Sequence, residues 1–274
     1  MWKTGTMNDS APDMARDAGA KRDMVGKALL LLDKLSAYPS GIPLSTLSRE
    51  TGFPLSTCHR LAAALIRDGF ATFDEDSKRY ALGLKVFSLA QYVAHRRGFA
   101  GSALPALEDL TSKTRETSLM SVRSGHNQLY VHHVQGPQQV SVIGTPGALG
   151  PLHCTSMGKV LVAFAPDVER KQLVDDLDLV AKTPRTVTGR AAFAEMIDQV
   201  RDQGFAVADE EHEIGIRALG VPVLSPDGHA LATVSIAAPS YRMEMAQMVE
   251  LLPHLHAAAQ QLAIVLPIAS FPGR

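Results

Sequence analysis

The sequence predicts an α+β fold in two domains, with an N-terminal winged helix-turn-helix and a larger domain in which helices pack on an antiparallel sheet. The 274 residues are more than one average domain needs. Helical periodicity followed by a hairpin pattern fills residues 24–83, whereas short strands bracketed by helices fill residues 99–274. The charge divides in the same way. Residues 21–98 carry 12 Lys and Arg against 7 Asp and Glu, and residues 99–274 carry 13 against 18.

The composition excludes several classes of protein. Hydrophobic residues make up 46% and charged residues 20% of the chain, which are ordinary globular values. The two cysteines, Cys58 and Cys154, lie far apart in unlike contexts, so we expect neither a disulfide framework nor a CxxC metal site. No apolar run approaches the ~20 residues of a membrane span, and the start lacks a signal-peptide pattern. We therefore expect a cytoplasmic protein that does not enter a membrane.

The first 83 residues predict an arm and two helices. Residues 1–23 show no periodicity, and we expect a disordered arm there. Apolar residues recur at three- and four-residue steps over 25–38, which predicts a helix that ends at Pro39-Ser40-Gly41. A short second helix is predicted over 44–50, ended by Gly52 and Pro54.

The next segments predict a recognition helix and a wing. A third helix over 56–68 has an apolar inner stripe formed by Cys58, Leu61, Ala62 and Leu65. Two short helices joined by a tight turn with a glycine are the pattern of a helix-turn-helix. Residues 70–73 and 79–82 then predict two strands around the polar turn 74–78, which is the pattern of a wing.

The remainder predicts a linker helix and a sheet domain. The linker covers 84–98, helical over 84–93 and broken by His95-Arg96-Arg97-Gly98. Further helices are predicted over 103–113, 156–164, 191–203 and 243–265. Strands are predicted over 118–122, 129–134, 140–143, 205–208, 217–223 and 231–237. Pro226-Asp227-Gly228 predicts a hairpin turn between the last two strands.

Polar residues at the start of the third helix are candidate contacts to double-stranded DNA. Only that end of a recognition helix fits deep into the ~12 Å wide major groove, so short polar side chains and a long donor are needed there. The candidates are Ser56, Thr57, His59 and Arg60 on this helix, Ser45 on the helix before it, and Lys78 and Arg79 at the wing tip. Alternatively, Ser56 only caps the helix, Arg60 is a solvated surface arginine, and the wing residues form an ordinary charged turn.

The helix predicted from residue 156 is a candidate anion site. Its first residues, Ser156, Met157 and Gly158, present free N–H groups and the positive end of the helix dipole, which suit a carboxylate. Alternatively, Thr155 or Ser156 caps the helix and nothing binds. The acidic run that begins at Asp209 is either near a ligand or a solvated turn.

Patterns of known enzymes fail on inspection. Gly158-Lys159 has His153 and Val160 where a phosphate-binding loop needs Gly and Ser or Thr. Zinc ligation at His212-Glu213 fails because Ile216 stands where the second histidine would be, and His132-His133 point to opposite faces of a strand. Cys154 beside His153 is not expected to form a catalytic pair. We expect no enzyme activity, cofactor or metal.

Several motifs resemble the IclR family of bacterial regulators. They are VGKALLLLD at 25–33, TGFPLSTCHRL at 51–61, YALG at 80–83, PLHCTSMGK at 151–159, DEEHEIGIR at 209–217 and SIAAP at 235–239. The resemblance covers about residues 24–266. It implies a winged helix-turn-helix joined to a GAF-like effector-binding domain, dimers through the DNA-binding half and often tetramers. It also implies a sequence-specific transcriptional regulator that binds a palindromic operator and responds to a small organic acid.

The resemblance also implies which residues bind the effector. They are Val142, Ser156, Met157, Asp209, Ile216, Ala218, Ser235 and Ala237. The chain departs from the family pattern where several relatives carry Cys at Ala218, Ser at Ala237 and a further Asp at Ala208, and each departure removes a polar atom. We therefore expect an aromatic or otherwise apolar carboxylic acid as effector. Alternatively, the alanines only loosen the packing.

Two other functions stay open at this point. One is a GAF-like small-molecule enzyme with an accessory nucleic-acid-binding domain, and the other is an architectural DNA binder without a ligand. The absence of an intact catalytic motif argues against the first, and the size of the second domain argues against the second.

Overall fold

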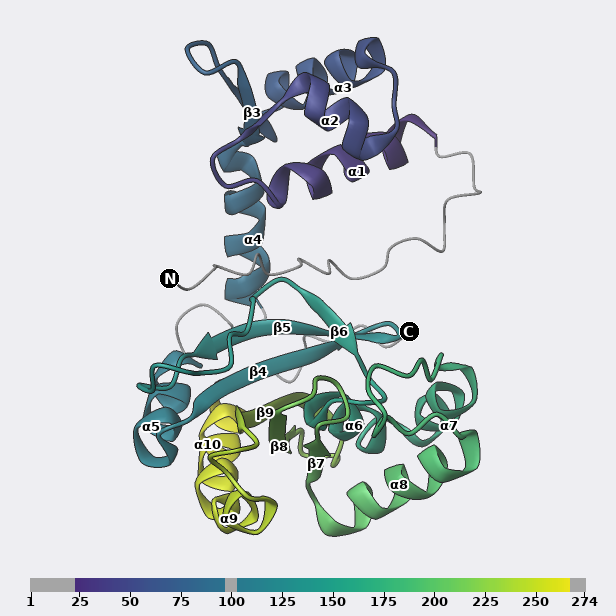
Figure 1. The fold of residues 1–274 in the computed structure, drawn as a ribbon, viewed down its shortest axis with the longest axis vertical. Helices are drawn as coiled ribbons and strands as arrows, with labels where there is room; N and C mark the ends of the chain where they lie inside the picture. Colours follow the sequence, from purple (N-terminus) through teal and green to yellow (C-terminus); the bar gives the residue numbers. More distant parts are fainter. Residues whose placement is uncertain (1–22, 97–102, 267–274) are drawn as a thin grey trace, which may run out of the picture. The chain divides into compact units, whose positions relative to one another are not determined.

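The computed structural model describes residues 23–96 and 103–266 (Figure 1). The arm predicted over 1–23 lies outside the described residues except for Asp23. The predicted boundary between the linker and the second domain, between residues 98 and 99, also lies outside them. The described residues divide into two compact units, with the division between His95 and Arg96. Within them, no helix is long and apolar enough to cross a membrane.

The first unit is a winged helix-turn-helix, as predicted. Its helices are α1 (Met24–Ser36), α2 (Leu44–Thr51) and α3 (Leu55–Arg67), and its strands are β1 (Ile42–Pro43), β2 (Ala71–Asp74) and β3 (Arg79–Leu82). The strands form an antiparallel sheet in the order β1-β3-β2. All four residues of the predicted inner stripe of α3 are buried in the core between the helices. Gly52 ends α2 in the left-handed conformation, with φ of 70°.

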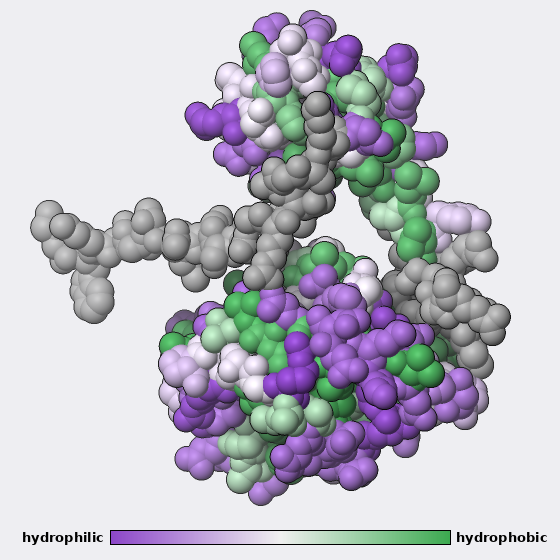
Figure 2. Space-filling model, turned by 90° about the vertical axis from the view of Figure 1, so that its right-hand side faces the viewer, coloured by the Kyte–Doolittle hydropathy of each residue, from purple (hydrophilic) through white to green (hydrophobic). Residues whose placement is uncertain are grey.

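Three details of this unit differ from the prediction. Helix α3 begins at Leu55, so Pro54 occupies the cap position and Ser56 does not cap the helix. Strand β1 was not predicted, because two residues are too few to show an alternating pattern. Helix α4 (Leu84–Arg96) continues through His95 and Arg96, because neither residue removes a backbone donor or requires a positive φ. Apolar side chains follow the length of α4 (Figure 2).

The second unit contains a six-stranded antiparallel sheet, which confirms the α+β prediction. Its strands are β4 (Thr117–Ser124), β5 (Asn127–Val134), β6 (Leu149–Pro151), β7 (Ala206–Asp209), β8 (Ile216–Leu224) and β9 (Ala230–Pro239). Their order is β6-β5-β4-β9-β8-β7. The predicted turn over 226–228 joins β8 to β9, where Gly228 has a φ of 81°.

Helices cover both faces of this sheet. They are α5 (Leu104–Thr114), α6 (Ser156–Ala163), α7 (Asp167–Asp176), α8 (Arg190–Gln203), α9 (Met245–Glu250) and α10 (Leu252–Val265). Helices α5 and α10 pack on one face of the sheet, and α6 packs on the other. Helices α7 and α8 pack against the outer side of α6 (Figure 1). Every residue of α6 is buried. Gly158 permits this burial, because a Cβ there would lie 2.5 Å from the backbone of Leu152.

Three predictions for this unit were wrong. Residues 140–143 form a loop rather than a strand, because the edge of β5 is occupied by the short strand β6. Helix α7 was missed, because it buries only Leu173 and so shows little periodicity. The last predicted helix is two helices that meet at Leu251, since Pro253 begins a new helix better than it continues one.

Candidate functional site

The candidate DNA contacts of α2 and α3 lie on the surface of the first unit. Ser45, Ser56, His59 and Arg60 are exposed, and Thr57 is half-buried. Nη2 of Arg60 donates a weak hydrogen bond to the sulfur of Met24 at 3.6 Å, and the side chain forms no ion pair with the described residues. Its guanidinium is therefore free to meet a base or a phosphate.

The two wing candidates differ in their surroundings. Lys78 has a positive φ of 55°, and its ammonium group lies 5.9 Å from the centre of the Phe73 ring at the exposed tip. Arg79 instead donates from Nη1 to the carbonyl oxygen of Gly41 at 2.8 Å. This hydrogen bond joins the wing to the turn before β1, so Arg79 has a structural role.

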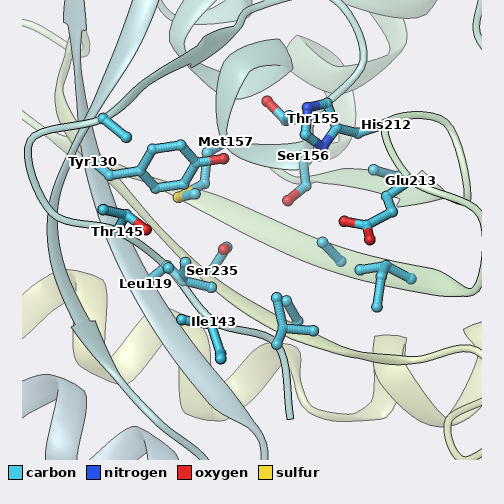
Figure 3. Close-up of a pocket in the computed structure, with 17 residues that line it drawn as sticks. Leu119, Tyr130, Ile143, Thr145, Thr155, Ser156, Met157, His212, Glu213 and Ser235 are labelled. Carbon is cyan, nitrogen blue, oxygen red and sulfur yellow. The ribbon is translucent and has the colours of Figure 1, made fainter. Parts of the chain in front are cut away.

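The second unit contains a cavity of about 220 Å³ on the α6 side of the sheet (Figure 3). Seven of the eight predicted effector-binding residues line it, namely Val142, Ser156, Met157, Ile216, Ala218, Ser235 and Ala237. Asp209 is not part of the lining. Its carboxylate accepts a hydrogen bond from Arg217 at 2.5 Å and also pairs with Arg185. The hydrogen bond from Arg217, together with the charges of both arginines, lowers the pKa of Asp209.

Three alanines lie side by side in the wall of this cavity. Ala208 pairs with Ala218 across β7 and β8, and Ala218 pairs with Ala237 across β8 and β9. All three line the cavity. The three alanines therefore form one continuous row of methyl groups.

The start of α6 brings polar groups into the cavity. Thr155 is the cap residue, and its hydroxyl accepts a hydrogen bond from the N–H of Gly158 at 3.0 Å. The N–H groups of Ser156 and Met157 have no partner among the described residues. Gly220 lies below them, and a Cβ there would come within 3.3 Å of the Ser156 side chain. A side chain at this position would press on the start of α6, so glycine suits this close approach of the helix to the sheet.

Ser235 adds an unpaired hydroxyl group beside the helix start. It pairs with Gly220 across β9 and β8 and is 1% exposed, yet its Oγ has no hydrogen-bond partner in the structure. A buried hydroxyl without a partner costs about 1 to 3 kcal/mol. A ligand that accepts a hydrogen bond would remove this cost.

Sequence reasoning missed several residues of the lining. The polar ones are Tyr130, Thr145, His212 and Glu213, and the apolar ones include Leu119, Ile143 and Ala148. His212 and Glu213 directly follow the acidic run 209–211, which is the sequence signal nearest to them. Residues 143–148 belong to the loop before β6, of which only 140–143 were predicted as a strand. Tyr130 reaches the cavity through an irregularity in β5 that is described below.

A buried ion pair positions the loop that carries His212 and Glu213. Lys159 of α6, 2% exposed, donates to Oε1 of Glu211 at 2.5 Å and to the carbonyl oxygen of Val207 at 2.8 Å. Burial lowers the pKa of this lysine. The hydroxyl of Thr186 also donates to the backbone carbonyl of Glu211. The ion pair therefore fixes this loop to α6, the helix whose first residues line the cavity.

Groups that a catalytic site would need do not come together. Burial raises the pKa of Cys154 to about 12, so its thiol keeps its proton. Nε2 of His153 lies 2.9 Å from the carbonyl oxygen of Val180, where it forms a hydrogen bond instead of pairing with Cys154. Within residues 23–96 and 103–266, no three His, Cys, Asp or Glu side chains are grouped to hold a metal ion.

Comparisons with known proteins agree with the fold. Residues 24–75 match the IclR helix-turn-helix domain, and residues 91–264 match the bacterial transcriptional regulator IclR C-terminal domain. The transcriptional regulator KdgR of Escherichia coli K12 is 28% identical over 93% of this chain and 98% of its own length. The crystal structure of Thermotoga maritima IclR is 28% identical, with a TM-score of 0.73 over 88% of this chain and 97% of that one.

A third relative is known with a small molecule bound. It is an IclR homologue from Microbacterium hydrocarbonoxydans, solved in complex with 4-hydroxybenzoate. It is 22% identical, with a TM-score of 0.75 over 89% of this chain and 99% of that one, which shows a common fold.

The winged helix-turn-helix and the sheet domain together define a DNA-binding transcriptional regulator rather than an enzyme. The chain belongs to the IclR family.

Proposed function

We propose that the protein is a sequence-specific cytoplasmic regulator whose second domain binds a small, largely apolar or aromatic carboxylic acid. The cavity carries this proposal, because it combines two kinds of surface. The free N–H groups of Ser156 and Met157 and the hydroxyl of Ser235 suit a carboxylate. The row of Ala208, Ala218 and Ala237 offers only methyl groups to the rest of the ligand.

The size of the cavity supports the same class of ligand. A dry cavity of about 150 Å³ in another protein holds benzene, so 220 Å³ leaves room for an aromatic ring with a carboxylate. A protein of the same fold binds 4-hydroxybenzoate, which belongs to this class. Two-carbon and three-carbon oxo acids would leave much of the apolar wall without contacts.

Calorimetric titration tests this proposal. Benzoate, 4-hydroxybenzoate and phenylacetate are expected to bind more tightly than glyoxylate and pyruvate, and to raise the melting temperature by mass action. Tight binding of glyoxylate or pyruvate without any response to the aromatic acids would contradict the proposed class.

The variant Ser156→Pro separates the anion site from the rest of the cavity. Ser156 is the first residue of α6, where proline is well tolerated, and Thr155 before it is already extended, with φ of −111° and ψ of 148°. The variant removes one N–H and is expected to lose affinity for the aromatic acids while it stays folded. Ser156→Ala also removes the hydroxyl but keeps the N–H, so a loss of affinity in Ser156→Pro beyond that in Ser156→Ala measures the contribution of the N–H.

The DNA-binding half of the proposal depends on α3. Arg60→Ala should weaken binding to the promoter of the protein's own gene by about 1 to 3 kcal/mol. Arg67→Ala is the matched control, because Arg67 lies at the far end of the same helix and pairs with Asp68. Lys78→Ala should weaken binding to specific and random DNA alike and reduce the salt dependence. If Arg60→Ala and Lys78→Ala both bind as the wild type does, this face is not the DNA contact.

We further propose that the protein is a dimer or a pair of dimers on a palindromic operator. Helix α4 supports this, since Leu84, Phe87, Leu89 and Val93 are 47% to 81% exposed. A second copy would cover these side chains. Phe87→Glu is expected to lower the molecular mass of the oligomer in solution, as measured by light scattering. A variant with the same mass as the wild type would exclude α4 from the interface.

A further inference from the structure

A third hydroxyl group points to the part of the cavity where an acid is proposed to bind. The side-chain oxygens of Tyr130, Ser156 and Ser235 converge there from β5, α6 and β9 (Figure 3). Ser156 and Ser235 belong to the predicted anion site, whereas nothing in the sequence motifs pointed to Tyr130.

An irregularity in β5 turns Tyr130 toward the cavity. Met120 of β4 pairs with His132, but the next residue, Ser121, pairs with Tyr130, so Val131 is an extra residue in β5. Such a bulge changes which face of the sheet the following side chains occupy. Without it, strict alternation would place Val131 opposite Ser121 and turn Tyr130 to the other face.

Two fully buried side chains hold the phenol group from behind. The hydroxyl of Ser121 donates to Oε1 of Gln128 at 3.3 Å, and Nε2 of Gln128 donates to the phenol oxygen of Tyr130 at 3.0 Å. Ser121 and Gln128 are both 0% exposed. Because the phenol oxygen already accepts a hydrogen bond, its own O–H remains available to donate into the cavity.

The surroundings also keep this proton in place. Burial raises the pKa of Tyr130 to about 12, so the phenol stays a donor at neutral pH. Gly150 of the neighbouring strand β6 leaves room for the pair, since a Cβ there would lie 2.8 Å from Nε2 of Gln128 and 3.0 Å from the Tyr130 ring.

We infer that Tyr130 is a specificity-determining residue that donates its phenol proton to the carboxylate of the bound acid, and that Gln128 is the residue that positions it. This role rests on the proposed function, because it requires an acid in the cavity. Together with Ser235 and the start of α6, the phenol surrounds the carboxylate with donors. A neutral amide of the same shape presents an NH₂ group to these donors and is expected to bind poorly.

Titration of the full chain with benzoate, 4-hydroxybenzoate and phenylacetate tests this inference. Tyr130→Phe keeps the ring and removes the hydroxyl, and it should weaken each acid at least about tenfold, the usual range for a hydrogen bond to a charged group. Benzamide should bind the wild type more weakly than benzoate, and Tyr130→Phe should narrow that difference. Tyr241→Phe, at an exposed tyrosine, is the matched control.

A double-mutant cycle separates the donor from the residue that positions it. Gln128→Leu should weaken the acids less than Tyr130→Phe does, and it should cost nothing further when Tyr130 is already Phe. The double variant leaves no buried amide opposite a missing hydroxyl, but it removes the acceptor of the Ser121 hydroxyl, so circular dichroism of each variant checks that it is folded. Equal losses from Gln128→Leu in both backgrounds would show a merely structural role for this pair.

The outcomes distinguish the two proposals. If the wild type binds the acids and Tyr130→Phe binds them equally well, Tyr130 is not a donor and the proposed function stands. If the wild type binds none of the acids, the proposed function fails and the role of Tyr130 fails with it.

Discussion

Four residues set the chemistry of the cavity. Ser235 places a buried hydroxyl without a partner beside the start of α6, and Ala208, Ala218 and Ala237 present only methyl groups in the wall next to it. A polar ligand would lose hydrogen bonds to water at the alanines without regaining them, whereas an apolar group loses nothing there. The proposed selectivity for apolar acids therefore depends on these small side chains.

This selectivity is expected to change at a single position. Ala218→Cys adds a thiol to the middle of the row and should shift the ratio of affinities toward glyoxylate and away from benzoate. Ala218→Val adds similar bulk without a polar group, so it should weaken benzoate without improving glyoxylate. Calorimetric titration of both variants measures the ratio. An equal effect of Cys and Val would mean that size alone matters at this position.

At the scale of residues, the resemblance to the IclR family named seven of the residues that line the cavity. Six of them lie at the start of α6 or on β8 and β9, and Val142 lies in a loop. Tyr130 was not found, since one extra residue in β5 reverses the alternation that sequence reasoning assumes. Asp209 was placed in the lining, but two arginines hold its carboxylate elsewhere.

At the scale of elements, the contact between α6 and the loop after β7 is the one that we expect mutation to disturb most. Lys159 and Glu211 are both buried, and each would be left as an unpaired charge without the other. The pair therefore holds the loop with His212 and Glu213 at the cavity. Buried ion pairs are in general no more stabilising than well-packed apolar pairs of similar volume.

Breaking this ion pair should cost far more than replacing it. Lys159→Met leaves Glu211 buried without a partner, and we expect the free energy of unfolding to fall by about 3 to 5 kcal/mol. The double variant Lys159→Met with Glu211→Leu should recover most of this loss. Urea denaturation monitored by circular dichroism measures both changes. A single variant as stable as the wild type would show that the pair is open to water.

The elements themselves were predicted where their periodicity is strong. Helix α3 and the hairpin of β8 and β9 follow from apolar spacing and turn residues. Helix α7 was not predicted, because its amphipathic pattern is weak. Strands β1 and β6 were not predicted, because they are too short to show an alternating pattern.

At the scale of the whole molecule, the two units carry opposite charge. The basic first unit suits the phosphates of DNA, and the acidic second unit contains the cavity. The family establishes regulation of transcription, and the proposal adds that an acid in the cavity changes how the first unit binds DNA. By thermodynamic linkage, DNA must then change the affinity for the acid by the same factor.

The affinity for DNA with and without the acid tests this account most directly. Fluorescence anisotropy would follow the full chain binding to the promoter of its own gene, alone and with saturating 4-hydroxybenzoate or benzoate. We predict that the acid changes the dissociation constant about fivefold or more in the wild type, and leaves it unchanged in Ser156→Pro, which should still bind DNA. An acid that binds the wild type in calorimetry yet leaves its affinity for DNA unchanged would contradict the account.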